Sequence, residues 1–192
     1  MGIGRIAIIL VIVIAAAIGL YIVTRSTPQP EPLQAQTEVR IAKFTAVSPP
    51  RPAPEAGFAS YDGKPRNLAD YRGHWLLINL WATWCGPCIK EMPTLAKLRE
   101  QLKSEIEIVA ISEDRKGKDA IDPFLNPLHI DPQMVGIDQS GAFTTLLKVQ
   151  GLPMSFLFDP KGDLVATLEG AADWQHPETI KALRALMAKP PS

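Results

Sequence analysis

The chain has 192 residues, of which 46% are hydrophobic, and its 20 basic and 20 acidic side chains give a formal net charge of zero. This length and apolar content are enough for one domain with a buried core and additional segments. A chain without a basic excess lacks the attraction to phosphates that drives nucleic-acid binding, so we expect no nucleic-acid partner. The two cysteines are too few for a framework of structural disulfides, and both lie in one short motif.

The N-terminal segment is strongly apolar. No charged residue interrupts positions 6–23, and this run approaches the ~20 residues that cross a membrane as a helix. We therefore predict a transmembrane anchor over residues 1–24. A cleavable signal peptide is the alternative, because Ala15-Ala16-Ala17 resembles a cleavage site. A short tail before the span and a large domain after it are typical of a signal anchor, with the domain outside the cytoplasm.

A proline-rich segment follows and predicts an extended tether over residues 25–52. Within it, Val39, Ile41 and Phe44 alternate as in a short strand, so part of the tether is expected to dock on the domain. The compact domain is predicted to cover residues 53–190.

Strand-like and helix-like patterns alternate along this domain. A hairpin with an Asp62-Gly63 turn is predicted first. Further strands are predicted at 75–81, 106–111, 134–137, 153–158 and 164–168, and helices at 89–102, 118–128, 140–149 and 176–188. This alternation predicts an α/β domain with a mixed sheet.

The motif Trp84-Cys85-Gly86-Pro87-Cys88 lies between a predicted buried strand and a predicted helix. A thiol at the first turn of a helix lies beside unsatisfied backbone N–H groups and the positive end of the helix dipole. Both favour the thiolate, which is the nucleophilic form of cysteine. The motif therefore indicates a reactive dithiol.

Three other interpretations of the two cysteines compete with this one. Zinc needs two further ligands, and His74, His129 and His176 have no paired spacing, so no metal site is predicted. A structural disulfide would close a very small loop and stabilise little. Incidental buried cysteines are the third alternative. Reversible thiol–disulfide chemistry is favoured over all three, with the Cys85–Cys88 disulfide as the redox group and no separate cofactor.

The segment 79–93, NLWATWCGPCIKEMP, resembles the active site of the thioredoxin superfamily. More narrowly, it is similar to the TlpA/ResA-like and cytochrome c maturation thioredoxins of the bacterial cell envelope, over roughly residues 53–188. The resemblance implies a thioredoxin fold with a mixed central sheet, an N-terminal β-hairpin extension and a central α/β insertion, preceded by one transmembrane helix.

The resemblance also implies roles for the motif residues. Cys85 would attack the substrate disulfide, and Cys88 would then resolve the mixed disulfide. Gly86 lets the substrate chain approach closely, and Pro87 suits the first helical turn. Trp84 either contributes to a docking surface or packs in the core.

A second family feature is the tripeptide Gly151-Leu152-Pro153. The resemblance implies a cis peptide bond before Pro153, and backbone groups of Leu152 that pair with an extended substrate segment. An ordinary trans proline at the start of a strand is the alternative.

We expect carboxylates to provide acid–base catalysis for the thiol chemistry. Asn79 stands where cytoplasmic thioredoxins carry a buried aspartate. Glu91, three residues after Cys88, matches a glutamate of the TlpA/ResA-like group, and we predict that it takes the proton of the Cys88 thiol. An exposed surface glutamate is the alternative. Glu113 follows the strand at 106–111 and is a second carboxylate expected near the site.

The Gly86-Pro87 dipeptide is the pairing found in reducing thioredoxins, so a reductase is favoured. The resemblance implies a membrane electron donor of the DsbD or CcdA kind. It also implies protein substrates on the periplasmic (extracytoplasmic) side of the inner membrane, such as apocytochrome c or copper-site assembly proteins. A disulfide oxidase or isomerase, and a non-catalytic chaperone or metal-delivery scaffold, are the alternatives.

Overall fold

The computed structural model of the chain describes residues 14, 21 and 41–188. The chain divides into two units, Met1–Glu38 and Val39–Ser192. Apart from Ile14 and Tyr21, the predicted anchor over residues 1–24 lies outside the described residues. Among the residues that the structure describes, none of the helices combines the length and the apolar character needed to cross a membrane.

The second unit is built on one mixed sheet, which confirms the predicted α/β class. Its strands are β1 (Thr45–Pro52), β2 (Gly57–Ser60), β3 (Pro65–Asn67), β4 (Leu76–Trp81), β5 (Glu107–Ser112), β6 (Val135–Ile137), β7 (Met154–Phe158) and β8 (Asp163–Glu169). They lie in the order β1-β8-β7-β4-β5-β6-β2-β3. Strands β4, β5 and β6 run parallel, and the other pairs are antiparallel.

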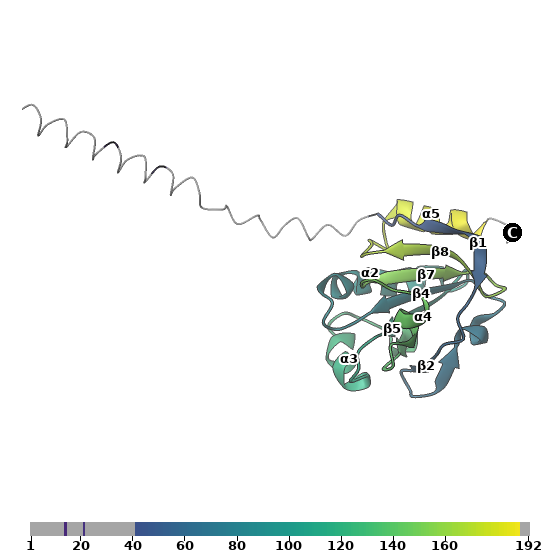
Figure 1. Ribbon diagram of the computed structural model, residues 1–192, viewed down its shortest axis with the longest axis horizontal. Coiled ribbons are helices and arrows are strands. Elements are labelled where there is room, and N and C mark those ends of the chain that lie inside the picture. Colours follow the sequence, from purple (N-terminus) through teal and green to yellow (C-terminus); the bar gives the residue numbers. More distant parts are fainter. Residues whose placement is uncertain (1–13, 15–20, 22–40, 189–192) are drawn as a thin grey trace, which may run out of the picture. The chain divides into compact units, whose positions relative to one another are not determined.

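Helices cover both faces of the sheet (Figure 1). They are α2 (Gly86–Leu102), α3 (Lys118–Leu125), α4 (Ala142–Leu146) and α5 (Pro177–Met187), with 3-10 turns η2 (Leu68–Tyr71) and η3 (Pro132–Met134). Leu95 of α2, Ile121 of α3 and Leu183 of α5 belong to one core cluster. Phe143 of α4 belongs to the cluster on the opposite face.

Strand β4 lies at the centre and is buried at every position. A strand buried on both faces is expected to be a continuous apolar run, and β4 departs from this only at Asn79. Its side chains alternate, so Leu77 and Trp81 join the cluster that α2 covers, and Leu80 joins the opposite one. Asn79 lies between Leu77 and Trp81 in this alternation and therefore points toward α2.

The predicted tether over residues 25–52 extends too far, because its last part is strand β1 of the sheet. Ala46 pairs with Ala166 and Arg51 with Leu164 of β8, with an irregular register between them. Prolines are tolerated here since β1 is an edge strand, which needs hydrogen bonds on one side only. The Ser48–Pro49 peptide bond in the irregular stretch is cis.

The residues just before β1 also dock on the domain, as the alternation around Phe44 predicts. The Ala42 N–H donates to Thr179 Oγ1 of α5 at 3.1 Å. The Phe44 ring lies edge-on against Trp174, with centroids 6.2 Å apart. The domain therefore begins before the predicted boundary at residue 53.

The remaining predicted elements are present with shifted ends. The hairpin is β2–β3, which pairs with β6 at the far edge of the sheet. The helix predicted over 118–128 ends at Leu125. Asn126 still has helical angles, but Pro127 after it has no N–H to continue the helical hydrogen bonds. The helix predicted over 140–149 is only Ala142–Leu146, and Lys148 adopts a positive φ of 55° soon after it.

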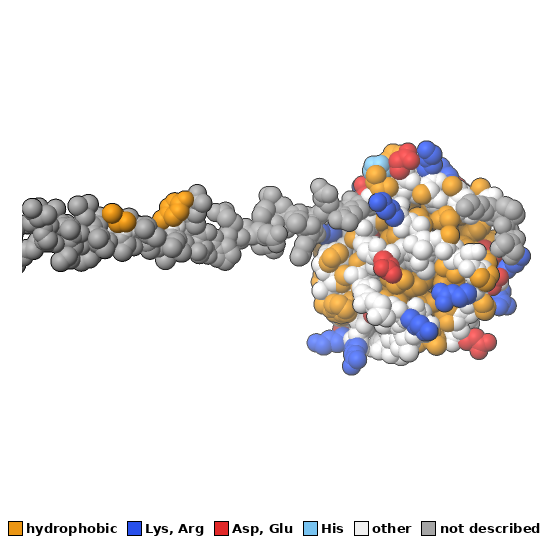
Figure 2. Space-filling view, turned by 45° about the horizontal axis from the view of Figure 1, so that its top comes forward, with side chains coloured by type: hydrophobic (Ala, Val, Ile, Leu, Met, Phe, Trp, Pro, Cys, Tyr) orange, Lys and Arg blue, Asp and Glu red, His pale blue; other side chains and the backbone are white. Residues whose placement is uncertain are grey.

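Charged side chains on the domain are scattered among apolar ones on the face that Figure 2 shows. Several pair locally across the surface, such as Arg184 with Glu105 at 2.6 Å and Arg99 with Asp131 at 2.7 Å. Exposed pairs of this kind contribute little to stability. They do balance the surface charge locally.

Candidate active site

The two cysteines form a disulfide at the start of α2, with an S–S distance of 2.06 Å. Cys85 is the N-cap residue of this helix, and its Sγ accepts a hydrogen bond from the Cys88 N–H at 3.3 Å. Pro87 lies in the first turn, where its missing N–H costs no helical hydrogen bond. After reduction, the same N–H group and the helix dipole would favour the Cys85 thiolate.

Exposure differs sharply along the motif. Cys88 is fully buried and Cys85 is 6% exposed, whereas Trp84 is 71% exposed. Trp84 is therefore a surface residue beside the dithiol, and the alternative that placed it in the core is wrong. Trp81 is fully buried in the core, as its position in the strand predicts.

The Leu152–Pro153 peptide bond is cis, as the family resemblance implies. Pro153 immediately precedes β7, and Met154 of β7 pairs with Leu80 of β4. Since β4 leads directly into the motif, this pairing places the proline loop beside the dithiol. Pro153 is buried, Leu152 is half-buried and Gly151 is exposed.

Asp114 fixes the loop that carries the motif. Its carboxylate accepts hydrogen bonds from the Thr83 N–H at 2.9 Å and the Thr83 hydroxyl at 2.8 Å, and a third from the Ser112 hydroxyl at 2.8 Å. Asp114 is 4% exposed, so these bonds satisfy a carboxylate that burial would otherwise penalise. Asp114 is not among the residues predicted from the sequence, although an aspartate just after a buried strand was an available signal.

Glu91 is fully buried on α2, so the alternative of an exposed surface glutamate is wrong. Its Oε1 accepts a hydrogen bond from Asn79 Nδ2 at 2.8 Å. Its Oε2 accepts from the Ala172 N–H at 2.8 Å and from Trp174 Nε1 at 3.0 Å. Three donors from the sheet and a distant loop therefore hold this carboxyl group.

The partners of Glu91 form a small polar network inside the core. Asn79 Nδ2 also donates to Ser155 Oγ of β7 at 3.0 Å. Asn79 Oδ1 is buried without a hydrogen-bond partner. The Thr94 hydroxyl donates to the Glu91 carbonyl at 2.8 Å and accepts from the Trp174 N–H at 3.3 Å. Ala172 and Trp174 lie between β8 and α5, and no local sequence pattern indicates their role.

Burial raises the pKa of Glu91 from 4.5 to about 7, and hydrogen bonds from Ala172, Asn79 and Trp174 oppose this rise. Desolvation disfavours the charged carboxylate, and the donors recover only part of the lost solvation. A carboxyl group with this pKa takes up and releases a proton at neutral pH.

Glu113 lies at the end of the neighbouring strand β5 and is half-buried. It lines a groove of about 560 Å³ together with Trp84 and Leu152. The structure thus brings the second predicted carboxylate to the border of the site, apart from the Glu91 network.

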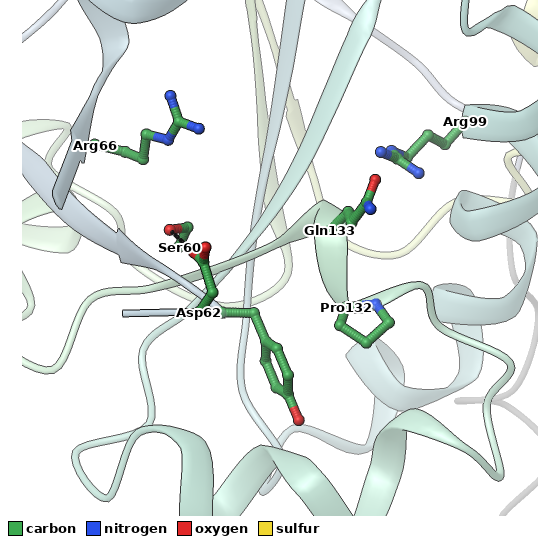
Figure 3. A pocket seen from close by; sticks show the side chains of 7 residues that line it. Ser60, Asp62, Arg66, Arg99, Pro132 and Gln133 are labelled. Atoms are coloured by element: carbon green, nitrogen blue, oxygen red, sulfur yellow. Dashed lines mark hydrogen bonds between the residues drawn. The ribbon is translucent and has the colours of Figure 1, made fainter. Parts of the chain in front are cut away.

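A second cavity, of about 430 Å³, shares no residue with this site. Arg66 and Arg99 point into it from opposite sides, with Gln133 between them (Figure 3). The charge of Arg99 is compensated by Asp131, and Asp62 also lines the cavity. This cavity therefore holds mixed charge and no group of the dithiol site.

The fold and the site together define a thiol–disulfide oxidoreductase: a C-x-x-C disulfide caps the helix after a central buried strand, and a cis proline lies beside it. The chain belongs to the AhpC/TSA family, whose model matches residues 49–167.

Relatives described as thiol-disulfide oxidoreductase ResA support this assignment. The chain is 33% identical to that of Bacillus thuringiensis subsp. konkukian over 119 residues, which is 62% of this chain and 68% of the relative. It is 30% identical to that of Geobacillus kaustophilus over 142 residues, 71% and 80% of the two chains.

A solved structure described as a putative thiol:disulfide interchange protein DsbE from Chlorobium tepidum superposes with a TM-score of 0.65 at 25% identity. The superposed region covers 72% of this chain and 97% of the Chlorobium tepidum chain. The thioredoxin-like fold and the enzymatic class predicted from the sequence are confirmed. The chain is a thiol–disulfide oxidoreductase of the ResA/DsbE type with the Cys85–Cys88 pair.

Proposed function

We propose that the chain reduces disulfides of specific cell-envelope proteins from a membrane anchor, using Cys85 and Cys88 and no separate cofactor. One observation carries the proposal: a fully buried carboxyl group, Glu91, lies one helical turn beyond a fully buried Cys88. A buried thiol can attack only after losing its proton, and Glu91 is the acceptor that the helix offers.

In the first step, the client disulfide is opened. The Cys85 thiolate attacks one client sulfur, a bond forms between protein and client, and the client S–S bond breaks. The second client sulfur leaves as a thiolate and takes a proton from water.

The second step releases the client. Glu91 takes the proton of the Cys88 thiol, and the resulting thiolate attacks Cys85 Sγ. The mixed disulfide breaks, and the remaining client sulfur leaves as a thiolate that is protonated in turn. Two electrons have passed to the client, and the protein holds the Cys85–Cys88 disulfide.

Client binding is assigned to the surface around the dithiol. Trp84, Gly86 and Pro87 are exposed beside Cys85. Leu152 and Pro153 lie opposite, at the start of β7. We assign the backbone of Leu152 to pairing with an extended client segment, which supplies affinity without demanding one client sequence.

We propose the direction of electron flow from the dipeptide that lies between the two cysteines. A strong oxidant such as DsbA, near about −120 mV, owes its potential to a stabilised reduced state, whereas thioredoxin lies near about −270 mV. The Gly86-Pro87 dipeptide agrees with the reducing assignment.

A redox titration tests the direction. We expect the dithiol to equilibrate with thiol buffers at a potential closer to the about −270 mV of thioredoxin than to the about −120 mV of DsbA. The fractions of dithiol and disulfide are measured by thiol alkylation followed by mass spectrometry. A potential near that of DsbA would reject the reductase and favour an oxidase or isomerase.

We further propose that residues 1–24 anchor the domain on the periplasmic side of the inner membrane. Residues 6–23 carry no charged side chain, and the resemblance to envelope thioredoxins supports the same location. Outside the cytoplasm no glutathione pool recharges a reductant, so a membrane electron donor of the DsbD or CcdA kind would supply the electrons. Apocytochrome c and copper-site assembly proteins are the proposed clients.

Membrane fractionation tests the anchor. We expect the full chain to stay with the membrane after an alkaline wash, and a chain lacking residues 1–24 to be released. Immunoblotting of both fractions measures the outcome, and protease added to spheroplasts should cut the domain. Recovery of the protein in the soluble fraction, shortened after Ala17, would instead establish a cleaved signal peptide.

A further inference from the structure

The groove of about 560 Å³ next to the dithiol is bordered by residues from separate segments of the chain. Trp84 comes from the motif loop, Glu113 and Arg115 follow β5, Thr144 belongs to α4, and Leu152 precedes the cis proline. Trp84 and Leu152 are the residues directly before Cys85 and Pro153. The groove therefore adjoins the dithiol, where a bound client segment would extend over it.

Glu113 lies in the wall of the groove with an incomplete set of hydrogen bonds. Its backbone N–H donates to the Trp81 carbonyl at 2.9 Å, which fixes the residue at the end of β5. Its Oε1 is buried and has no hydrogen-bond partner. Its Oε2 faces Gly141, since a Cβ placed on that glycine would lie 3.7 Å away. Buried polar atoms in folded proteins are nearly always paired, so this carboxyl group is an exception, and Glu113 is the one acidic residue among the described ones that line the groove.

Two further charged groups lie around the groove, and one of them, Asp138, acts on Glu113 directly. Asp138 lies at the end of β6, where its carboxylate accepts hydrogen bonds from the N–H groups of Ser140, Gly141 and Phe143 and from the Ser140 hydroxyl. Arg115 lines the groove and forms no ion pair among the residues that the structure describes.

The neighbouring Asp114 is already engaged, because its carboxylate accepts from Thr83 and Ser112. Burial raises the pKa of Glu113 to about 7. The Thr144 side chain lowers it and the Asp138 carboxylate raises it.

We propose that Glu113 is a specificity-determining residue, which binds a lysine or arginine side chain that the client carries next to its disulfide. This inference rests on the proposed reductase function and identifies the class of client that the site prefers. A cation held in the groove beside Glu113 offsets the negative charges of the Glu113 and Asp138 carboxylates. A neutral client offers the carboxylate no opposite charge, and an acidic client meets like charge.

Peptides with one internal disulfide test the proposal. Three versions carry lysine, alanine or glutamate beside the first cysteine, and the reduced full-length chain is mixed with each in a single turnover. We expect the second-order rate constant for the lysine peptide to exceed that for the alanine peptide by about tenfold, as for one hydrogen bond to a charged group. The reduced peptide is measured by chromatography after acid quenching.

Glu113→Gln is expected to abolish this preference, so that the ratio of the lysine to the alanine rate falls to about one. Glu113→Ala serves as a second variant, and thermal unfolding verifies that both fold. Glu107→Gln is the matched control, since Glu107 is an exposed glutamate at the opposite end of the same strand. It should keep the full preference.

The preference should also depend on pH in a defined direction. Only the ionised carboxyl binds the cation, so the ratio of the lysine to the alanine rate should rise from about pH 6 to about pH 8, through the pKa of about 7. Cysteine ionisation affects both peptides alike and cancels in the ratio.

Three results would overturn the proposal: an unchanged lysine preference in Glu113→Gln, no lysine preference in the unaltered chain, or a preference for the glutamate peptide that Arg115→Gln removes. Failure of the proposed function is distinguishable, because the alanine peptide would then not be reduced at all.

Discussion

Cys88→Ser is expected to convert the enzyme into a trap that holds its client as a stable mixed disulfide on Cys85. Serine keeps the backbone N–H that donates to Cys85 Sγ, so the attacking thiolate keeps its stabilisation. Release of the client then needs an external thiol, and the adduct should persist roughly 10²-fold longer or more, because an intramolecular attack has become bimolecular. Non-reducing electrophoresis and mass spectrometry of the Cys85 peptide measure the adduct.

Ellman's reagent provides the matching kinetic control. The reduced enzyme should release two thionitrobenzoate ions per chain in successive phases, and Cys88→Ser only one. Cys85→Ser should form no lasting adduct, since Cys88 is fully buried. If Cys85 of the Cys88→Ser variant reacts with the reagent but captures no envelope protein in cells, the proposal of a protein disulfide as substrate is wrong.

Glu91→Gln is expected to slow the release of the client while leaving the attack on the client intact. In the assay with Ellman's reagent, the first phase reports attack by Cys85 and the second reports attack by Cys88. Loss of a positioned general base should slow the second phase by about 10²-fold. In the unaltered chain this phase should accelerate with pH through the Glu91 pKa of about 7, and the variant should lack that step.

We also expect Glu91→Gln to change how the free energy of unfolding depends on pH. The pKa of Glu91 is raised from 4.5 to about 7, so the folded protein holds this proton more tightly than the unfolded chain does. Its contribution to the free energy of unfolding is therefore largest below pH 4.5, and it falls as the pH rises to about 7. The complete fall is about 3 kcal/mol at 1.36 kcal/mol for each pKa unit.

Denaturant unfolding of both proteins at several pH values measures this difference. The unfolding free energy of Glu91→Gln, relative to that of the unaltered chain, should rise by roughly 2 kcal/mol between about pH 5 and pH 8. Asn79 Oδ1 is unpaired in the structure. If the Asn79 side-chain amide flips, this oxygen can accept a hydrogen bond from the amide of the new glutamine. A folded variant is therefore expected.

Glu100→Gln is the matched control for both measurements, because Glu100 is an exposed glutamate on the same helix. It should change neither the second phase nor the pH dependence of stability. Equal slowing of both phases by Glu91→Gln would contradict a role specific to Cys88. An unchanged second phase would remove Glu91 from the mechanism.

The sequence predicted those parts of the site that adjoin each other along the chain. The C-x-x-C motif lies between a buried strand and a helix, and local patterns suffice to place Cys85 at the first helical turn. The cis bond before Pro153 and the candidacy of Glu91 came from family resemblance. Periodicity could not show that Glu91 is buried, since a glutamate on a helix is usually solvated.

The groups that position the site could not be predicted because tertiary packing brings them together. Asp114 reaches Thr83 across 31 positions of the chain, and Trp174 reaches Glu91 across 83. Each of these residues would be compatible with a solvated loop on its own. The same holds for β1, whose prolines suggest an extended linker until the edge of β8 offers it a partner.

The proline content of β1 has a consequence for a protein that handles partly opened clients. A sheet edge with free N–H groups can recruit extended segments of other chains and start aggregation. In β1, Pro49, Pro50 and Pro52 have no N–H to offer, and the irregular register bends the strand between its paired ends. This border of the sheet is a poor template for a further strand. Under the proposed function, extended client segments would lose one competing place to bind, which would favour their pairing with the loop before Pro153.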